Sequence, residues 1–289
     1  MGYILLGFSA ANSSQNTALI RAGNRSLPRV HSTMAHVHVH SSDTHSQSNG
    51  LPSADEIVHS NRAYFDNLAS TPAPAAHSHS HARVAANIVS SIRAHPGLVP
   101  LSEATTRLLD YACGTGAVSR LLLPHVASIV GVDVSAGAVA EFNTAARNQG
   151  LDEGEMRAVT ADLVTGEGDV AALADDRFDV VVCSLAFHHM PSPRETTAAL
   201  ARRLVPGGVF VCIDFRAHED LGEQWKSIIP HNGFGEDQVR EWYVGAGLEE
   251  PVFRPVGEDG KGVTLLNRGL DDGELTVRRE VFMAIGKKP

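Results

Sequence analysis

The segment Arg107–Leu123, RLLDYACGTGAVSRLLL, constrains the fold of this chain most strongly. A short apolar run ends in an acid, passes through glycines and enters an apolar pattern with helical spacing, which is typical of a strand, a ligand-binding loop and a helix. Because glycine has no Cβ, Gly114 and Gly116 let the backbone turn tightly and approach a ligand. A second acid, Asp133, ends the next apolar run, SIVGVDV. The segment therefore predicts the first unit of a doubly wound α/β domain.

Strand and helix patterns alternate from this segment onward. This alternation predicts a parallel sheet with right-handed crossovers. Two final strand candidates have no helical pattern between them and predict an antiparallel hairpin at one sheet edge. The expected fold is a seven-stranded, mostly parallel, doubly wound α/β sheet of the Rossmann-like kind. The strand candidates are 107–112, 128–134, 156–162, 178–186, 208–215, 251–256 and 278–286, and the helix candidates lie near 117–124, 136–149, 168–174, 193–204 and after 236.

The part of the chain before the sheet has a different composition. Ten of the fifteen histidines precede residue 96, among Ser, Ala and Pro. Such a composition buries too little apolar surface to offset chain entropy, so we expect residues 1–54 to be a disordered leader. Two amphipathic patterns within residues 55–100, of which the first is capped, predict helices that cover the ligand mouth, with a His-rich linker between them. Residues 101–289 are then the ligand-binding domain.

Alternating histidines raise the question of a metal site. Their spacing would let either of two trios take up a divalent metal, and a metal-handling leader is one alternative function. We favour a solvated low-complexity tail and predict no metal centre. The two trios are His36, His38 and His40, and His77, His79 and His81.

Charge and cysteine content restrict the partners and the compartment. The formal net charge is −9, and residues 97–289 carry eighteen basic against twenty-nine acidic residues, which argues against a large surface that follows nucleic-acid phosphates. Cys113, Cys183 and Cys212 fall in or at the ends of predicted strands, as expected in a reducing compartment. No apolar run approaches the roughly 18–20 residues of a membrane helix. We expect a cytoplasmic protein, with mitochondrial targeting by the acid-free start as the alternative.

Five motifs, in this order and spacing, resemble those of class I S-adenosylmethionine-dependent methyltransferases: DYACGTG, VGVDVS, TADL, FDVVVCSLAFHHM and VPGGVF. The likeness is greatest to the small-molecule branch that includes the ubiquinone and menaquinone biosynthesis methyltransferases, and it covers roughly residues 55–289. It implies S-adenosylmethionine as the cofactor and methyl transfer to a small-molecule acceptor.

The first motif implies part of the cofactor site. Asp110, Gly114 and Gly116 match family positions at which the glycines admit the amino-acid and ribose region and the acid faces the ammonium group. Ala112 stands where many relatives have another glycine. Its methyl group puts in doubt how closely the backbone approaches the cofactor.

The later motifs imply the remaining cofactor contacts. Asp133, followed by Val134, matches the acid that accepts from both ribose hydroxyls, although an N-cap of the next helix is an alternative role. Asp162 matches the acid that accepts from the adenine amino group, with the Leu163 N–H at a ring nitrogen; an ordinary turn is the alternative. Ser184 is expected to face the ammonium group.

The end of the fourth predicted strand carries the candidate catalytic residues, His188 and His189. A histidine pKa near 6.5 suits proton removal at neutral pH, but a packing or orienting role is equally compatible with the sequence. Methyl transfer is an in-line displacement with a neutral leaving group, so positioning can supply much of the acceleration. Candidate substrate contacts, for which ordinary packing is the alternative, are Tyr64, Phe65, Phe187, Asp214, Trp225 and His231.

The same motifs also bear on other possible functions. A nicotinamide dehydrogenase is disfavoured because GTGAVS lacks the third glycine of GxGxxG and the chain has no Tyr-x-x-x-Lys. Nucleic-acid methylation is disfavoured by the absence of an Asn/Asp-Pro-Pro-Tyr/Phe motif, a Pro-Cys nucleophile and a basic appended domain. A non-catalytic cofactor-binding partner and a protein methyltransferase stay open. The sequence does not choose among oxygen, nitrogen, sulfur and carbon as the methyl acceptor.

Overall fold

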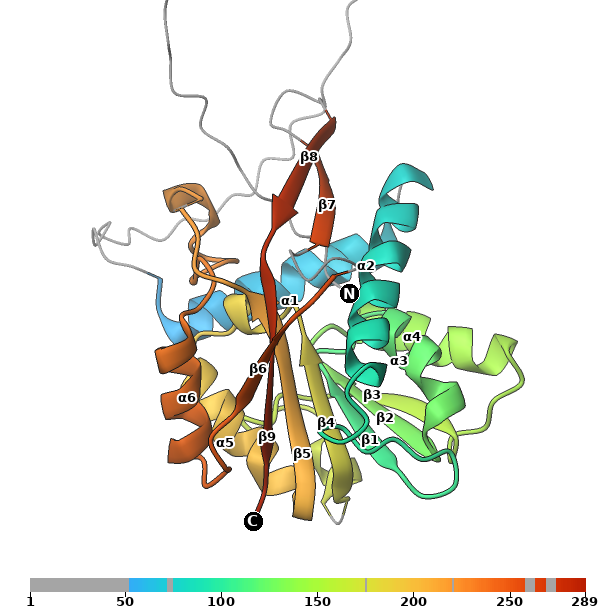
Figure 1. The fold of residues 1–289 in the computed structure, drawn as a ribbon. Helices are drawn as coiled ribbons and strands as arrows, with labels where there is room; N and C mark the ends of the chain where they lie inside the picture. Colours follow the sequence, from blue (N-terminus) through green and yellow to red (C-terminus); the bar gives the residue numbers. More distant parts are fainter. Residues whose placement is uncertain (1–51, 72–74, 175, 220, 258–262, 269–273) are drawn as a thin grey trace, which may run out of the picture. The chain divides into compact units, whose positions relative to one another are not determined.

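Seven strands form the central sheet of this computed structural model, in the order β3-β2-β1-β4-β5-β9-β6 (Figure 1). The structure describes residues 52–71, 75–174, 176–219, 221–257, 263–268 and 274–289. Strands β1 to β5 pair in parallel, and β9 runs antiparallel to both β5 and β6. The predicted fold class and edge hairpin are confirmed. The strands are β1 (Arg107–Tyr111), β2 (Ser128–Asp133), β3 (Met156–Thr160), β4 (Phe178–Ser184), β5 (Leu204–Phe215), β6 (Val252–Pro255) and β9 (Val281–Lys287).

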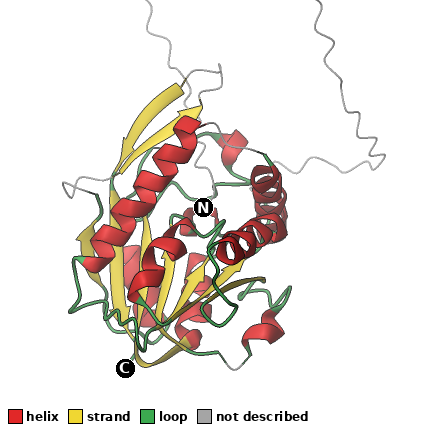
Figure 2. Cartoon of the chain, turned by 90° about the vertical axis from the view of Figure 1, so that its right-hand side faces the viewer, coloured by secondary structure: helices red, strands yellow, loops and turns green. Residues whose placement is uncertain are grey.

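Helices cover both faces of the sheet (Figure 2). On one face, α2, α3 and α4 bury Ile88, Leu122 and Phe142; on the other, α5 and α6 bury Leu200 and Tyr243. The central strands are mostly apolar on both faces, as expected for a parallel sheet that is buried on both sides. The helices are α1 (Ala54–Ser70), α2 (Ala75–Arg93), α3 (Ala117–Leu122), α4 (Ala136–Asn148), α5 (Pro193–Arg203) and α6 (Glu236–Gly245), with 3-10 turns η1 (Leu123–His125), η2 (Val170–Leu173), η3 (Phe187–His189) and η4 (Glu223–Trp225).

Helix α1 lies across the carboxyl ends of the strands (Figure 1). It begins at the predicted cap, where Ser53 and Glu56 form a reciprocal capping box. The C-terminal part of α1 is fastened to the N-terminus of α4, because the carboxylate of Asp66 accepts from the Ser135 hydroxyl at 2.6 Å and from the Gly137 N–H at 3.0 Å. These bonds hold α1 as a roof over the loops that follow the strands.

Three segments differ from the sequence prediction. Helix α2 begins at Ala75, directly after Pro74, so the expected His-rich linker contributes the first turns of a helix. The helix expected at 168–174 is only the 3-10 turn η2, in a segment that contains two glycines and three acids between 166 and 175. Strands β7 (Val263–Arg268) and β8 (Glu274–Arg279) form a separate antiparallel pair that the sequence analysis did not predict.

The predicted leader lies almost wholly outside the described residues, and so do His36, His38 and His40. In the described part of the chain, no group of three His, Cys, Asp or Glu side chains is arranged to hold a metal ion. Within the same residues, no helix has the length and apolarity needed to cross a membrane. The three cysteines are buried and unbonded to one another.

Candidate cofactor and substrate site

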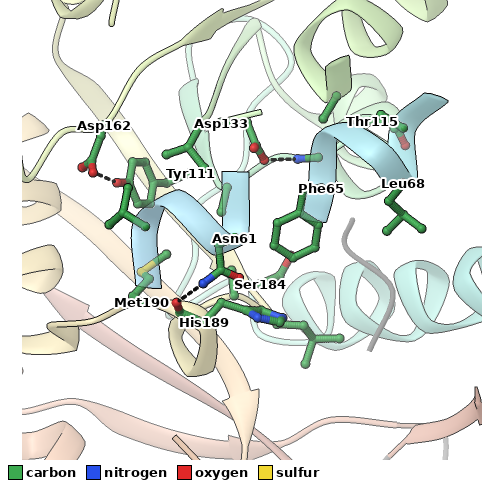
Figure 3. A pocket seen from close by; sticks show the side chains of 18 of the residues that line it. Asn61, Phe65, Leu68, Tyr111, Thr115, Asp133, Asp162, Ser184, His189 and Met190 are labelled. Atoms are coloured by element: carbon green, nitrogen blue, oxygen red, sulfur yellow. Dashed lines mark hydrogen bonds between the residues drawn. The ribbon is translucent and has the colours of Figure 1, made fainter. Parts of the chain in front are cut away.

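A cavity of about 690 Å³ lies between α1 and the carboxyl ends of β1, β2 and β4 (Figure 3). Its volume falls within the range of about 300–1,000 Å³ that is usual for small-molecule sites. It occupies the edge at which ligands bind in doubly wound sheets. Residues from four of the five sequence motifs and from α1 line it: Val58, Asn61, Phe65, Leu68, Ala112, Gly114, Thr115, Arg120, Asp133, Val134, Glu141, Asp162, Ser184, Leu185, His189, Met190 and Glu195 are among them.

The loop between β1 and α3 forms one wall of the cavity. Its backbone is left-handed at Ala112, Gly114 and Gly116, with φ angles of 57°, 53° and 82°. Glycine adopts this region without strain, whereas a residue with a Cβ is disfavoured there by about 1–2 kcal/mol. Ala112 therefore keeps the backbone path that a glycine would take, at a cost in stability.

Replacing Ala112 with glycine is expected to raise the free energy of unfolding by about 0.5–1 kcal/mol, because relief of the left-handed strain exceeds the larger chain entropy of glycine. Urea unfolding measures the change. Ala140→Gly, in an exposed position of α4, is the matched control and should lower stability by about 1 kcal/mol. A loss of stability in Ala112→Gly would mean that the loop is not strained at this residue.

Gly116 is required by its surroundings as well as by its φ angle. A Cβ built there would lie 2.6 Å from Cδ2 of the fully buried Phe142. We expect Gly116→Ala to lower the free energy of unfolding by about 2 kcal/mol through backbone strain and overpacking. Gly97→Ala, where a Cβ meets nothing within 4 Å, is the control. Equal unfolding midpoints for the two variants would contradict this account.

Asp133 joins the end of β2 to the glycine loop. Its two carboxylate oxygens accept from the Gly114 N–H at 2.8 Å and the Ser135 N–H at 2.9 Å. The side chain is buried, and burial raises the pKa of this carboxyl while the hydrogen bonds oppose that rise. The N-cap of α4 is Ser135, whose hydroxyl accepts from the Ala138 N–H, so the alternative role of Asp133 as the cap of this helix is wrong. Asp133 therefore organises the loop and keeps acceptor capacity toward the cavity.

Asp162 lies on the same side of the cavity, after β3. Its Oδ1 accepts from the Val164 N–H at 2.8 Å and the Thr165 N–H at 3.3 Å, and the Tyr111 hydroxyl lies 3.5 Å away (Figure 3). These bonds form an ordinary turn, which is the alternative role predicted for Asp162. These three hydrogen bonds all use Oδ1, so the turn and a ligand contact through Oδ2 are compatible.

Asp110 is buried behind the glycine loop and is not among the cavity-lining residues. Its Oδ2 accepts from the Ser119 hydroxyl at 2.6 Å. Burial raises its pKa to about 6, the Ser119 bond opposes the rise, and the nearby Asp133 carboxylate adds to it. Asp110 is therefore placed to influence a cofactor indirectly, by supporting the glycine loop and by its negative charge, and not by direct contact.

The two adjacent histidines have different surroundings. His188 is buried outside the cavity lining; its Nδ1 lies 2.8 Å from Oδ1 of Asp214, and its backbone N–H also donates to that carboxylate. His189 lines the cavity, and its Nδ1 lies 2.8 Å from the Ile228 carbonyl oxygen. Because a carbonyl can only accept, Nδ1 of His189 carries the proton and Nε2 carries a lone pair. The His188–Asp214 pair holds η3 and thereby orients His189.

Burial and the neighbouring His188 lower the pKa of His189 well below its ordinary value. The imidazole is therefore neutral at pH 7. Phe65 from α1 packs its ring edge-to-face against His189, with ring centroids 5.1 Å apart. These contacts leave His189 fixed in orientation at the cavity wall.

The structure brings together only part of the predicted site. The predicted residues at the cavity are Phe65, Ala112, Gly114, Asp133, Val134, Asp162, Ser184 and His189. Those outside its lining are Tyr64, Asp110, Gly116, Leu163, Phe187, His188, Asp214, Trp225 and His231. Phe187 packs in the core against Phe210 and Trp242. His231 bonds the Met190 carbonyl, so it supports the cavity wall from behind.

Asn61 lines the cavity but is not among the predicted site residues; its side chain is buried, with 5% of its surface exposed. Its Nδ2 donates to the Ile57 carbonyl at 3.0 Å and to the His189 carbonyl at 2.9 Å. A signal was present, because Asn61 follows Ile57 and precedes Phe65 at four-residue spacing on the apolar side of α1. A polar residue at a core position of an amphipathic helix indicates a buried partner.

Comparisons with known proteins agree with this geometry. Residues 109–212 match the family model described as a methyltransferase domain. An uncharacterized methyltransferase of Schizosaccharomyces pombe is 37% identical over 101 residues, which are 35% of this chain and 36% of that protein. A ubiquinone biosynthesis O-methyltransferase of Pseudomonas entomophila is 30% identical over 108 residues, 37% of this chain and 44% of that protein. The chain thus spans less than half the length of these curated relatives.

A solved structure has the same fold. The magnesium protoporphyrin IX methyltransferase of Synechocystis, with bound S-adenosylhomocysteine, aligns with a TM-score of 0.54 at 16% identity, over 81% of this chain and all of that one. The sheet order, the glycine loop and the family match define a Rossmann-like methyltransferase domain. In its fold and in the matched residues 109–212 the chain is similar to the class I S-adenosylmethionine-dependent methyltransferases.

Proposed function

We propose that this chain transfers a methyl group from S-adenosylmethionine to a small-molecule acceptor that binds beneath α1. One observation carries the proposal: a single cavity is lined by the glycine loop and acids of the sheet and also by the apolar side of α1. Cofactor and acceptor would therefore share one enclosed space. Val58, Phe65 and Leu68 from α1 would exclude water from the acceptor side.

The cavity fits the cofactor. Each oxygen of Asp133 accepts one backbone N–H and retains a lone pair for a ribose hydroxyl. Oδ2 of Asp162 would accept from the adenine amino group, and Ser184 at the end of β4 would meet the amino-acid end. When bound, the cofactor supplies a methyl group on a sulfonium; a lone pair of the acceptor would attack the methyl carbon in line with the carbon–sulfur bond, and a neutral thioether would leave.

Positioning would account for most of the rate enhancement in this site. Holding two reactants in line can correspond to effective molarities of about 10⁵ M or more. His189 is the candidate general base, because it lines the cavity, its Nε2 is unprotonated and its orientation is fixed by Ile228 and Phe65. Since His188 is bonded to Asp214 and lies outside the cavity lining, we propose it as a positioning residue.

The proposed acceptor class is supported by similar proteins. One relative is a ubiquinone biosynthesis O-methyltransferase, and the solved structure acts on a magnesium porphyrin, both by their names. A roofed cavity of about 690 Å³ suits such molecules better than a segment of folded protein. The alternatives are a protein acceptor and a non-catalytic cofactor-binding partner.

Transfer of an isotopically labelled methyl group separates these functions. The full chain is incubated with labelled S-adenosylmethionine and, separately, with metabolite fractions and protein fractions of an extract. Mass spectrometry should find the label in a metabolite. Label in protein alone would support protein methylation, and tight cofactor binding without any labelled product would support the non-catalytic function; either result would overturn the proposal.

A further inference from the structure

A continuous chain of hydrogen bonds joins α1 to Asp133 at the cavity wall. Oδ1 of Asp66 accepts from the Ser135 hydroxyl at 2.6 Å and from the Gly137 N–H at 3.0 Å. The Ser135 N–H donates in turn to Oδ1 of Asp133 at 2.9 Å. Ser135 is fully buried, and neither it nor Asp66 is among the cavity-lining residues. Asp66 is therefore connected to the cavity through Ser135 and Asp133 without lining it.

Ser135 is the centre of this chain of hydrogen bonds. Its hydroxyl hydrogen is donated to Asp66, and its hydroxyl oxygen accepts from the Ala138 N–H at 3.0 Å. A hydroxyl has one hydrogen, so donation to Asp66 fixes its rotation. Asp66 and Ser135 together satisfy the N–H groups of Gly137 and Ala138, which have no partner within the first turn of α4. The turn between β2 and α4 is thus held in place from α1.

Helices α1 and α4 approach closely at the same point. A Cβ built on Gly137 would lie 3.2 Å from Cβ of Ala69 and 3.4 Å from Oδ1 of Asp66. The absence of a side chain at Gly137 therefore lets the last turns of α1 pack directly on the first turn of α4. A displacement of α1 at Asp66 would be transmitted to the turn that carries Asp133.

We propose that Asp66 is a positioning residue for the cofactor: it couples the docking of α1 to the orientation of Asp133. This inference rests on the proposed function, in which Asp133 receives the ribose hydroxyls. Without the Asp66 side chain, the Ser135 hydroxyl and the Gly137 N–H lose their acceptor, and the turn is less ordered before binding. A site that must be ordered during binding binds its ligand more weakly. Because coupling is reciprocal, the bound cofactor also holds α1 in its docked position.

Calorimetric titration of the full chain with S-adenosylhomocysteine tests the inference. Asp66→Ala is expected to weaken binding about five- to tenfold, although residue 66 does not line the cavity. Asp66→Asn keeps Oδ1, the atom that accepts both hydrogen bonds, and should bind within about twofold of the unaltered chain. Unchanged binding by Asp66→Ala, or an equal loss in Asp66→Asn, would overturn the inference.

The matched control is Glu56→Ala, at the other end of α1. It removes an exposed acid and one of the two hydrogen bonds of the capping box, so it weakens the helix without touching α4. Its affinity for S-adenosylhomocysteine should stay within about twofold of that of the unaltered chain. A loss as large as that of Asp66→Ala would show that any weakening of α1 has the same effect, and would contradict a specific role of Asp66.

A double-mutant cycle separates positioning from a merely structural role. Ser135→Ala removes the hydroxyl that bonds Asp66 and leaves the N–H that bonds Asp133, and it should weaken binding by a factor similar to that of Asp66→Ala. Adding Asp66→Ala to this variant should weaken binding by less than about threefold further, because the connection is already broken. Independent effects would multiply, giving a further loss of about five- to tenfold, and would refute the connection through Ser135.

Urea unfolding shows whether each variant is folded at the temperature of the titration. If Asp66→Ala does not fold, Ser135→Ala tests the same connection from its other end, and unchanged binding by it would overturn the inference. Lower stability of a folded Asp66→Ala with unchanged affinity would mean that Asp66 only caps α4. If the unaltered chain does not bind S-adenosylhomocysteine, the proposed function fails and the inference fails with it. If the unaltered chain binds and the Asp66 and Ser135 variants bind equally well, the inference alone fails.

Discussion

Replacing Asp133 with alanine is expected to weaken the binding of S-adenosylhomocysteine by at least about 100-fold. A hydrogen bond to a charged group contributes about 1.5–3 kcal/mol, and the variant loses two proposed bonds to the ribose hydroxyls. It also loses the carboxylate that holds the Gly114 and Ser135 N–H groups, so the loop would be less ordered before binding. A loss of about 3 kcal/mol corresponds to roughly 100-fold in the dissociation constant. Isothermal calorimetry measures it directly.

The control for Asp133→Ala is Glu153→Gln, which removes a carboxylate from an exposed turn. Its dissociation constant should equal that of the unaltered chain. Circular dichroism establishes that the Asp133 variant is folded at the temperature of the titration. A folded Asp133→Ala that binds within about threefold of the unaltered chain would refute the proposed ribose contact.

Replacing Asp110 with asparagine is expected to stabilise the protein by about 3 kcal/mol at pH 7. The folded-state pKa of about 6 exceeds the usual value of 3.8, so the folded protein holds this proton more tightly than the unfolded chain does. A carboxyl whose pKa is raised by folding destabilises the folded state increasingly as pH rises from about 4 to about 6, and each pKa unit corresponds to about 1.4 kcal/mol. Asparagine has no charge to bury and can still accept from the Ser119 hydroxyl.

Urea unfolding between pH 4 and pH 8 measures this effect. The difference in unfolding free energy between Asp110→Asn and the unaltered chain should grow as pH rises through this window and level off above pH 7. Asp152→Asn, on an exposed turn, is the control and should show no such growth. A difference that is independent of pH would show that Asp110 is not destabilised by its charge. Weaker cofactor binding in the stabilised variant would show that the buried charge is retained for function.

The sheet could be predicted because its signals are local and repeated. Runs such as RLLDY and FDVVVCS are short and mostly apolar, and they alternate with helical patterns, which leaves few topologies open. The start of α2 could not be predicted in this way. Residues 75–81 have small and polar side chains with no apolar period. They form the first turns of α2, and the apolar pattern that indicates a helix starts only further along, near Val84, which is buried. Strands β7 and β8 were not predicted, and β8 overlaps the candidate strand 278–286 only at its last two residues.

The cofactor side of the site was more predictable than the acceptor side. Asp133 and Asp162 follow strands at a spacing that brings them to one sheet edge, and the structure places both at the cavity. The roles of adjacent side chains depend on tertiary contacts that the sequence does not display. His188 and His189 are neighbours in the sequence, yet His188 is hydrogen-bonded to Asp214 whereas His189 lines the cavity. Asn61 acquires its importance only when α1 is docked against η3.

A crystal structure of the full chain with S-adenosylhomocysteine tests the account most directly. We expect the ligand in the cavity beneath α1, with its ribose hydroxyls within hydrogen-bond distance of Asp133 and its adenine amino group at Asp162. The thioether sulfur should face the space between Asn61 and His189. A ligand bound elsewhere, or bound in this cavity with its ribose away from Asp133, would contradict the proposed site.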